Sequence, residues 1–486
     1  NQQTEANASG QTWSQSGKLD LVNFSDLQTL LGKYPASGPR YTSYPTAADF
    51  SADFTATDLD RSIGLSNSRN LEREAAVDLS VYLHLPFCEH LCFYCGCNKV
   101  LTRNRGKGVV YLDHLIREMD LWNARLKGER TVRQLHLGGG TPTFFTVTQI
   151  QQVMEHLGRH FNLVPESPAR DYSIEIDPRT VDADYIAGLV NTGFNRFSIG
   201  VQDFDPDVQA AVHRLQEADH VAGLVDSARA CGIGSINFDL IYGLPRQSVA
   251  SFRRTLERVV DCAPDRLSIY QYAHLPERFP AQQRILEVEL PDLETRLALQ
   301  QLTMDTLADA GYIHIGMDHF ARPGDPLVLA MHNGTLKRSF QGYTTHGDCE
   351  LLGMGVSSIG EIGDCLYQNG KDLNAYYESV DADRLAVERG ILMNADDHVR
   401  KDVIMDIMCH GEVDRTAFFK ANGMDFQTYF PQAEGALTQM AADGLLDIND
   451  RYLRVTPRGR FLIRNIAMLF DRYRTANCTT RFSKTV

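Results

Sequence analysis

Six short runs rich in β-branched and aromatic residues alternate with amphipathic stretches from about residue 76 of this chain. The runs are VDLSVYLHL, RQLHLGG, YSIEI, NRFSIGV, SINFDLIYG and RLSIYQYA. The stretches with helical apolar spacing include residues 149–161, 183–192, 217–230 and 251–262. Strands that alternate with helices pair in parallel, because each helix returns the chain to the edge where the next strand begins. We therefore predict an α/β fold, a partial, curved parallel barrel of the (βα)6 type, with ligands at the C-terminal ends of its strands.

The segments on either side of this region predict further parts of the chain. Residues 1–17 are rich in Gln, Ser and Asn and contain no apolar run, which predicts a disordered tail and not a secretory signal. Residues 18–75 begin with helical spacing over 19–33 and continue into the turn-rich segment GPRYTSYPTA. Residues 76–375 hold the strand–helix units and are predicted to be the main domain. Residues 376–486 are predicted to form a separate C-terminal domain.

This C-terminal domain is expected to be mainly helical, with helices over residues 396–409, 415–421 and 432–443. A two-strand hairpin, LLDIND-RYLRVT, and a final helix over 458–473 follow. Three helices and a hairpin resemble a winged-helix module, and the alternative is a helical cap on the barrel. Because the region is not notably basic, a cap is favoured over a DNA-binding module.

Charge and cysteine usage narrow the class of protein. The chain has 48 Lys and Arg against 62 Asp and Glu, a net charge of −14, which disfavours general nucleic-acid binding but not a local basic pocket for a small anion. No apolar run approaches the length needed to span a membrane. Four of the ten cysteines fall within residues 88–97. This clustering indicates a reducing cytoplasm and one metal site, not a disulfide scaffold.

The strongest chemical signal is Cys88-x3-Cys92-x2-Cys95, directly after the first predicted strand. Thiolates are the usual ligands of iron–sulfur clusters. Three close cysteines bind three irons and leave a fourth iron open to chelate the amino and carboxylate groups of an amino acid. Zinc is the alternative, but two spaced CxxC pairs are absent from the sequence. Cys97 could close the cluster as a fourth ligand; we assign it a non-ligand role that lines the site.

This cysteine motif after a β-strand resembles the radical S-adenosylmethionine superfamily. The longer string YLHLPFCEHLCFYCGCNK resembles one of its families, the oxygen-independent coproporphyrinogen III oxidases (dehydrogenases) of haem biosynthesis. The likeness runs from about residue 38 to the C-terminal region. It includes GPRYTSYPTA, LHLGGGTPT, SIEIDPR, FNRFSIGVQDF, NFDLIYGLP, YAHLP, GMDHFARP, FQGYTT, LLGMGVSSIG and RGRFLIRNI. The sister family of haem chaperones shares the three cysteines, but usually has an aromatic residue at the position of Cys97 and lacks GPRYTSYPTA.

The resemblance implies a [4Fe–4S] cluster, two S-adenosylmethionine molecules and a radical reaction. In that reaction a 5′-deoxyadenosyl radical takes a hydrogen from the β-carbon of a propionate, and the substrate radical then loses CO2 and one electron. Two propionates of coproporphyrinogen III become vinyl groups, which gives protoporphyrinogen IX. A haem chaperone and a radical enzyme for another tetrapyrrole are the alternatives. We also expect the protein to be a monomer and to bind no nucleic acid. An electron donor such as a flavodoxin or ferredoxin is expected to reduce it.

The resemblance also assigns residues to the cofactors, with Cys88, Cys92 and Cys95 as the cluster ligands. The first S-adenosylmethionine is expected to contact Tyr82, Tyr94, Gly139, Glu175 and Ile359. The second is expected to contact Gly140, Thr141, Gln202, Arg214, Asp239 and Ala273. Taken singly, these residues have simpler explanations. A tight turn accounts for the glycines, and an ion pair with Arg179 or another arginine accounts for Glu175. Caps, surface charges or turns account for the others.

Tyr82 and His84 lie two residues apart on the first strand, so their side chains share a face. Tyr82 suits a cation–π contact with a sulfonium, and His84 is either a core residue or a proton or substrate contact. A substrate with four propionates needs cations, and Arg40 of GPRYTSYPTA is one candidate. The other candidates form a run after the cysteine loop, Lys99, Arg103, Arg105 and Lys107. A solvated charge run is the alternative for these four, and GPRYTSYPTA is expected to close over the substrate as a lid.

Overall fold

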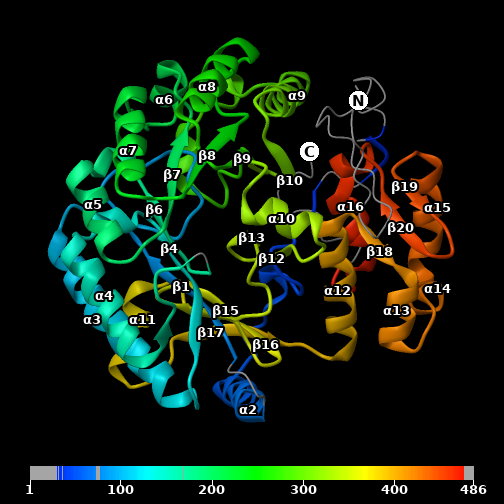
Figure 1. The fold of residues 1–486 in the computed structure, drawn as a ribbon, viewed down its shortest axis with the longest axis horizontal. Coiled ribbons are helices and arrows are strands. Elements are labelled where there is room, and N and C mark those ends of the chain that lie inside the picture. The colour runs from blue at the N-terminus through cyan, green and yellow to red at the C-terminus, as the bar shows by residue number, and fades with distance from the viewer. Residues whose placement is uncertain (1–29, 31, 35–36, 73–76, 168, 475–486) are drawn as a thin grey trace.

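The computed structural model describes residues 30, 32–34, 37–72, 77–167 and 169–474 (Figure 1). The tail predicted over 1–17 and most of the helix predicted over 19–33 lie outside the described residues. In the part of the chain that is described, no helix is both long and apolar enough to cross a membrane.

A parallel sheet forms the centre of the molecule, as the alternating runs predict. Its strands are β1 (Leu79–Leu85), β4 (Thr131–Gly139), β6 (Asp171–Ile176), β7 (Arg196–Gln202), β8 (Ser235–Tyr242) and β9 (Arg266–Gln271). They lie side by side in the order β9-β8-β7-β6-β4-β1, and every neighbouring pair is parallel. Since consecutive strands are neighbours, their C-terminal ends meet along one edge of the sheet. That edge is where the predicted site residues are expected.

Helices between the strands cover the outer face of the sheet (Figure 1). They are α3 (Arg105–Arg125), α4 (Val147–His160), α5 (Ala183–Asn191), α6 (Pro206–Ala211), α7 (Ala218–Ala230), α8 (Val249–Cys262) and α9 (Leu293–Asp309). Four of them match the predicted stretches to within two residues at each end. The apolar side chains of these helices and of the strands share one large core, in which Trp122 of α3 is fully buried.

The sheet extends beyond the six predicted strands at both edges and contains 13 strands in all. Next to β1 lies the parallel strand β14 (Glu350–Met354), followed by the antiparallel strands β15 (Ile359–Ile362), β16 (Cys365–Asn369) and β17 (Val387–Leu392). At the other edge, β11 (His319–Ala321) and β10 (Ile313–Gly316) pair antiparallel beside β9. The short strand β5 (Asn162–Leu163) pairs with β4. Helix α11 (Leu373–Asp381) connects β16 to β17, and α2 (Ala56–Glu72) lies beside β15 and β16.

The C-terminal part forms its own core after β17. Its elements are α12 (Ala395–His410), β18 (Glu412–Asp414), α13 (Arg415–Asn422), α14 (Phe426–Tyr429), α15 (Glu434–Ala442), β19 (Leu446–Ile448), β20 (Tyr452–Val455) and α16 (Ile463–Ala467). The strands form a three-stranded sheet in the order β18-β20-β19, so the predicted hairpin is present. The single final helix predicted over 458–473 is wrong. Only 463–467 is α-helical, and 3-10 turns flank it on both sides.

The GPRYTSYPTA segment is anchored to this C-terminal core. Tyr41 and Tyr44 are 1% and 0% exposed, and both belong to the core built mainly from residues after 402. The Tyr41 hydroxyl donates to Asp471 at 2.9 Å, and Arg464 Nε donates to the carbonyl of Pro39 at 2.9 Å. The expected lid is therefore held by contacts across more than 400 residues of sequence, and its turns are packed.

A buried carboxylate links α3 to the unpredicted part of the sheet. Glu118 is 0% exposed and accepts hydrogen bonds from the Gly355 amide, the Asn369 side chain and the Tyr376 hydroxyl at 2.7 to 2.8 Å. Burial raises the pKa of Glu118, and these donors oppose that rise. The carboxylate thus joins three segments that are distant in sequence.

We expect Glu118→Ala to lower the free energy of unfolding by about 2–4 kcal/mol, because three buried donors lose their acceptor. Urea unfolding of the purified protein, followed by circular dichroism, measures the loss. Asp113→Ala removes an exposed carboxylate from the same helix and is the matched control, with an expected change within about 0.5 kcal/mol. Equal stability of the two variants would contradict the importance of the Glu118 network.

Candidate active site

The cysteine loop begins at the C-terminal end of β1. The short strands β2 (Phe87–Cys88) and β3 (Val100–Leu101) pair in parallel and close the loop at its base. Cys88 and Cys92 are buried, Cys95 is half-buried, and Cys97 is exposed. Because β1 lies between β4 and β14, the loop rises from the middle of the sheet edge. This is the position predicted for the metal site.

The three thiols are spaced too widely for a single zinc ion. Among the described residues, Cys88, Cys92 and Cys95 do not form a set whose ligand atoms all lie within 4.8 Å of one another. A zinc ion holds its thiolates about 3.8 Å apart, given Zn–S bonds of about 2.3 Å. A cluster of several irons needs the wider spacing. The arrangement fits an iron–sulfur cluster and disfavours the zinc alternative.

The protonation of these thiols also depends on their surroundings. Burial raises the pKa of Cys88 to about 12, although Thr141 Oγ1 donates to its sulfur at 3.3 Å. Hydrogen bonding from Cys97 lowers the pKa of Cys95 to about 6 against the opposing effect of burial, and Lys99 contributes in the same direction. Since only thiolates bind iron, loading of the site must release the Cys88 proton.

Two arginines and one aspartate surround Cys92. Arg179 Nη2 and Arg214 Nη1 each lie 3.5 Å from the Cys92 sulfur, and both side chains bind Asp177. Although burial opposes ionisation, Arg214 and Arg179 hold the pKa of Asp177 at about 2. The terminal nitrogens of Arg214 meet the two Asp177 oxygens at 3.4 Å, and one of them donates to Gly200 O at 2.6 Å. Sequence reasoning missed Asp177, for which the only signal is its place after the third strand in SIEIDPR.

The glycines at the end of β4 press against the cysteine loop. Gly139 has a φ of +119°, which favours glycine, and its amide donates to Glu175 at 3.1 Å. A Cβ on Gly140 would collide with the carbonyl oxygen of Pro86 and lie 3.0 Å from that of Phe87. The amides of Gly140 and Thr141 donate to Leu85 O and Phe87 O at 2.9 Å. A tight approach of two backbones therefore explains these glycines by itself, and their contacts with S-adenosylmethionine stay a prediction.

Glu175 lies beside His136 of β4 and not beside Arg179. It accepts from His136 Nε2 at 3.3 Å, and its side chain keeps 42% of its surface accessible. Burial opposes its ionisation, but the hydrogen bonds from His136 and Gly139 lower the pKa of Glu175. The ion pair between Glu175 and Arg179 that served as the simpler explanation is absent, because Arg179 binds Asp177. An ionised, accessible carboxylate suits an ammonium ligand.

Tyr82 and His84 face the same side of β1 and contact each other. The Tyr82 hydroxyl lies 3.1 Å from His84 Nδ1, and His84 Nε2 donates to the carbonyl of Asn98 at 2.9 Å. Because a carbonyl only accepts, Nδ1 accepts the Tyr82 proton, and burial lowers the pKa of His84. The Tyr82 ring stacks on His136 with centroids 5.9 Å apart. His84 is therefore a neutral ring, and its hydrogen bond to the carbonyl of Asn98 supports the cysteine loop.

Three of the residues predicted for a second ligand lie on or just after neighbouring strands: Gln202 ends β7, Asp239 lies in the C-terminal half of β8, and Ala273 follows β9. Gln202 has a φ of +65° where the pairing of β7 with β8 shifts register. Asp239 accepts from Ser198 at 2.7 Å and Asn237 at 3.0 Å, and burial raises its pKa to about 6. The carbonyl of Ala273 accepts from Gln282 at 3.1 Å. The structure thus brings these residues to one edge, but it does not test what they bind.

Two apolar contacts complete the predicted set. Tyr94 packs beside Val208, Val212 and Leu244, and its carbonyl accepts from Gln282 Nε2 at 2.9 Å. Gln282 therefore joins the cysteine loop to the segment after β9. Ile359 begins β15 and packs against a small core that contains Phe50, Leu366 and Met393.

The cations predicted for the substrate mostly have partners within the chain. Arg40 forms an ion pair with Asp318 and lies 5.4 Å from the centre of the Tyr270 ring. Lys99 Nζ donates to the carbonyl of Cys95 at 3.1 Å. Arg105 forms an ion pair with Glu89, while Arg103 and Lys107 are exposed. Substrate contacts by these residues stay a prediction.

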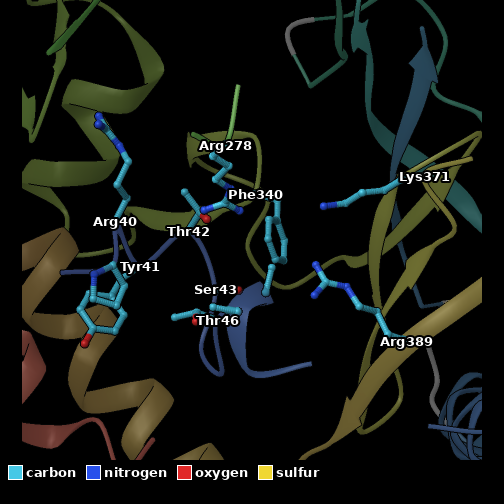
Figure 2. A pocket seen from close by; sticks show the side chains of 12 residues that line it. Arg40, Tyr41, Thr42, Ser43, Thr46, Arg278, Phe340, Lys371 and Arg389 are labelled. Atoms are coloured by element: carbon cyan, nitrogen blue, oxygen red, sulfur yellow. The ribbon is translucent and has the colours of Figure 1, made fainter. Parts of the chain in front are cut away.

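A pocket of about 440 Å³ lies beside the GPRYTSYPTA segment (Figure 2). Three of its cations, Arg278, Lys371 and Arg389, were missed by sequence reasoning. They come from the segment after β9, the segment after β16, and β17. No local motif joins them, and the pairing that gathers them was itself unpredicted.

Comparisons with known proteins agree with this architecture. The model of the radical SAM superfamily matches residues 82–259, and that of the HemN C-terminal domain matches residues 393–462. The fold, the cysteine loop and these matches define a radical S-adenosylmethionine protein, which holds a [4Fe–4S] cluster and S-adenosylmethionine.

Relatives then identify the family within the superfamily. An oxygen-independent coproporphyrinogen III oxidase of Pseudomonas aeruginosa is 46% identical over 96% of this chain and 100% of its own length. That of Escherichia coli is 46% identical over 91% of this chain and 94% of its own length. The solved structure of the E. coli coproporphyrinogen III oxidase HemN, described as a radical SAM enzyme, has 43% identity and a TM-score of 0.85 over 92% of this chain and 99% of its own. The chain belongs to the oxygen-independent coproporphyrinogen III oxidase family.

Proposed function

We propose that this chain catalyses the oxygen-independent oxidative decarboxylation of coproporphyrinogen III. Two propionates become vinyl groups, and the product is protoporphyrinogen IX. The observation that carries the proposal is the near full-length match to relatives with this name, across both the sheet and the C-terminal part. The cysteine loop supports it, because its three thiols follow the C-terminal end of β1 and do not all lie within 4.8 Å of one another, as ligands of a single zinc ion would.

The chain's own residues have distinct roles in this proposal. When bound, the cluster and S-adenosylmethionine supply a 5′-deoxyadenosyl radical that takes a hydrogen atom from a propionate β-carbon. Cys88, Cys92 and Cys95 hold the cluster, and Arg179 and Arg214 stabilise the negative charge on the Cys92 sulfur.

Binding of S-adenosylmethionine follows from the carboxylates and apolar residues at the strand ends. Glu175 accepts from the ammonium of the first molecule, Tyr82 faces its sulfonium, and Ile359 and Tyr94 cover its apolar surface. The second molecule is proposed to lie at Gly140, Thr141, Gln202, Arg214, Asp239 and Ala273. Arg214 already binds Asp177 and Gly200 with its terminal nitrogens, so a ligand carboxylate there has to share it.

The setting of the enzyme is part of the same proposal. We expect a cytoplasmic monomer that takes electrons from a flavodoxin or ferredoxin. Residues 76–375 are proposed to be the catalytic domain and 376–486 the C-terminal domain, although β17 still belongs to the main sheet. Cys97, exposed beside the loop, lines the site without binding iron.

The test is anaerobic reconstitution with iron and sulfide, followed by reductant, S-adenosylmethionine and coproporphyrinogen III. We expect protoporphyrinogen IX, two CO2 per product and 5′-deoxyadenosine. A methylated linear product from haem would instead indicate a radical enzyme for another tetrapyrrole. Stoichiometric haem binding without 5′-deoxyadenosine formation would indicate a haem chaperone.

The pKa of Asp239 gives a pH-dependent prediction for the second S-adenosylmethionine. The pKa is raised to about 6 from 3.8, so the carboxylate ionises between pH 5 and 7. If the ionised form binds an ammonium or ribose hydroxyl, the affinity of this second ligand should rise about tenfold over that range. The pH dependence of folding stability has the opposite direction. Because the pKa of Asp239 is higher in the folded state, its contribution to the free energy of unfolding is lost as pH rises through 6. Equilibrium dialysis at several pH values measures the affinity.

Asp239→Asn is the matched variant, because it keeps the shape and removes the titration. Its binding of the second S-adenosylmethionine should be weak and independent of pH, while the first molecule binds as in the unaltered protein. A flat pH profile for the unaltered protein would argue against Asp239 as a ligand.

A further inference from the structure

The pocket beside the GPRYTSYPTA segment collects positive charge from separate parts of the chain. Figure 2 shows Arg278, Lys371 and Arg389 directed toward the space beside Phe340, whereas the Arg40 side chain extends away from it. We propose that Arg278, Lys371 and Arg389 form the site that binds propionate carboxylates of the tetrapyrrole substrate. This inference rests on the proposed function and deepens it by naming the residues that recognise the substrate.

The three cations repel one another in the absence of an anion. Burial lowers the pKa of Lys371, and the charges of Arg389 and Arg278 lower it further. The pKa of Arg389 is lowered by burial and by Arg278, with partial compensation from Glu388. A bound carboxylate would reduce this repulsion, and each further carboxylate would reduce it more.

Lys371 and Arg389 keep donors available for a ligand. Arg389 donates from Nε to Gln368 Oε1 at 2.7 Å, which fixes the direction of the guanidinium. Within the described part of the chain, the terminal nitrogens of Arg389 and the Lys371 ammonium have no ion pair or hydrogen-bond partner. A guanidinium with free terminal nitrogens can bind a carboxylate through two coplanar hydrogen bonds, whereas an ammonium binds it as a compact point charge.

The lining of the pocket also fits a porphyrinogen, which is an apolar macrocycle with acidic side chains. Phe340 offers an apolar surface within the ring of cations, and residues 39–48 supply the opposite wall. Arg40 differs from Lys371 and Arg389 because Asp318 already neutralises it. A tetra-anionic substrate would therefore meet, in Lys371 and Arg389, two cations whose donors are available for carboxylates.

The pocket borders the cysteine loop. The carbonyl of Lys371 accepts from Asn98 Nδ2 at 3.2 Å, and the carbonyl of Asn98 accepts from His84. A Cβ on Gly96 would lie 3.1 Å from the ring of Phe279, the neighbour of Arg278. Carboxylates held in the pocket therefore place the substrate next to the loop whose cysteines hold the cluster.

The test compares Lys371→Gln, Arg389→Gln and the double variant in the reconstituted holoenzyme with S-adenosylmethionine. The probes are coproporphyrin III, which has four carboxylates, and its tetramethyl ester, which has none. Each single variant should weaken binding of the acid by about tenfold to a hundredfold, and the ester should be affected little. For turnover of coproporphyrinogen III, KM should rise more than kcat falls.

A matched control removes the same charges elsewhere. Lys127→Gln with Arg253→Gln changes two exposed cations away from the pocket and should leave the affinity for coproporphyrin III unchanged. Equal affinity of the double pocket variant and the unaltered enzyme would overturn the inference while product formation continues. An unaltered enzyme that forms no protoporphyrinogen IX would instead overturn the proposed function. Formation of 5′-deoxyadenosine without substrate reports that each variant is folded and loaded.

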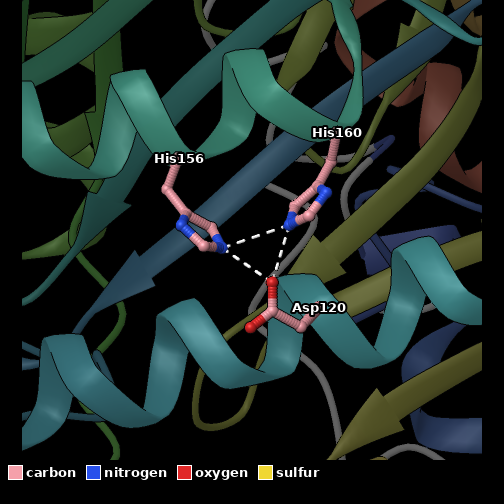
Figure 3. A group of neighbouring side chains, drawn as sticks. All are labelled: Asp120, His156 and His160. Carbon is pink, nitrogen blue, oxygen red and sulfur yellow. Dashed lines mark hydrogen bonds and ion pairs between the residues drawn. The ribbon is translucent and has the colours of Figure 1, made fainter.

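A second cluster lies on the outer helices, independent of the active site. His156 and His160 of α4 and Asp120 of α3 point toward one another (Figure 3). Their histidine Nε2 atoms lie 2.8 and 2.6 Å from Asp120 Oδ1 and 3.2 Å from each other. We infer that these three side chains bind a divalent transition-metal ion such as Zn²⁺.

The triangle has the dimensions of a coordination face. Bonds of about 2.1 Å give ligand–ligand edges of about 3.0 Å in an octahedral face and about 3.4 Å in a tetrahedral one. The edges of 2.6 to 3.2 Å need only a small expansion to reach these values. Two imidazoles with one carboxylate favour Zn²⁺, Co²⁺ or Ni²⁺ over Mg²⁺ or Ca²⁺. The ion would link α3 to α4, with the remaining positions open to water because Asp120 is 49% exposed.

Calorimetric titration of the reconstituted holoenzyme with Zn²⁺ tests this site, with iron content measured before and after. We expect one equivalent to bind and to raise the melting temperature, and His156→Gln and Asp120→Asn to lose at least tenfold in affinity. His332→Gln removes an exposed histidine elsewhere and should bind Zn²⁺ as the unaltered protein does. Equal Zn²⁺ binding by His156→Gln and His332→Gln would overturn the inference.

Discussion

Cys92→Ala is expected to abolish cluster assembly and to lower protoporphyrinogen IX formation by at least about a thousandfold. The variant removes one of three thiolates that the loop presents for iron. It also leaves Arg179 and Arg214 without the sulfur that lies 3.5 Å from each of them, next to a single carboxylate at Asp177. Iron and sulfide analysis, charge-transfer absorbance and anaerobic turnover measure the result.

Cys97→Ala is the matched control for this prediction. Cys97 lies two residues beyond Cys95, is exposed, and contacts the cluster loop through its amide, which donates to the Cys95 sulfur at 3.5 Å. Alanine keeps that amide, so iron and sulfide content should be unchanged. Product formation by Cys92→Ala would refute the radical scheme. Loss of the cluster in Cys97→Ala would show that Cys97 is a ligand.

The central sheet was predictable because its signals are local. The six parallel strands were each recognisable as a short apolar run, and four of the helices between them by their amphipathic spacing, so chain order and parallel pairing follow. The extension from β14 to β17 was not predicted. Its strands are short, and β14 pairs with β1 through residues more than 250 positions apart, such as Leu79 and Glu350. Pairing of that kind leaves no periodic trace in the sequence.

The candidate site divides in the same way. The cysteine loop was found from its motif, and Glu175 and Asp239 were found because the family resemblance assigns them to the cofactors. The partners of the charged residues were not predicted. Arg179 was considered for Glu175 and binds Asp177, because Glu175 points from β6 toward His136 of β4. Which neighbour a side chain selects depends on sheet register and rotamer, which the sequence does not encode locally.

Gly140→Ala is expected to lower product formation by about a hundredfold without removing any ligand of the cluster. A Cβ at this position would collide with the backbone of Pro86, which precedes β2 and the first cysteine. A backbone cannot rotate away as a side chain can, so the end of β4 and the cysteine loop must separate. The hydrogen bonds from Gly140 to Leu85 and from Thr141 to Phe87 would stretch or break. Displacement of a reactive group by about 1 Å costs on the order of 10²-fold in rate.

Gly223→Ala provides the control for adding a methyl group. Gly223 lies in α7, and nothing stands within 4 Å of its Cβ position, so alanine should leave activity unchanged. Anaerobic turnover is measured per bound cluster, because Gly140→Ala is also expected to load less iron. Because Gly140 is also proposed to contact the second S-adenosylmethionine, binding of that molecule is measured as well. Loss of activity with unchanged binding would show that the contact between β4 and the loop positions the cluster. Full activity of Gly140→Ala at full cluster loading would mean that this contact is dispensable, and that the three thiols set the geometry of the site without support from the neighbouring strand.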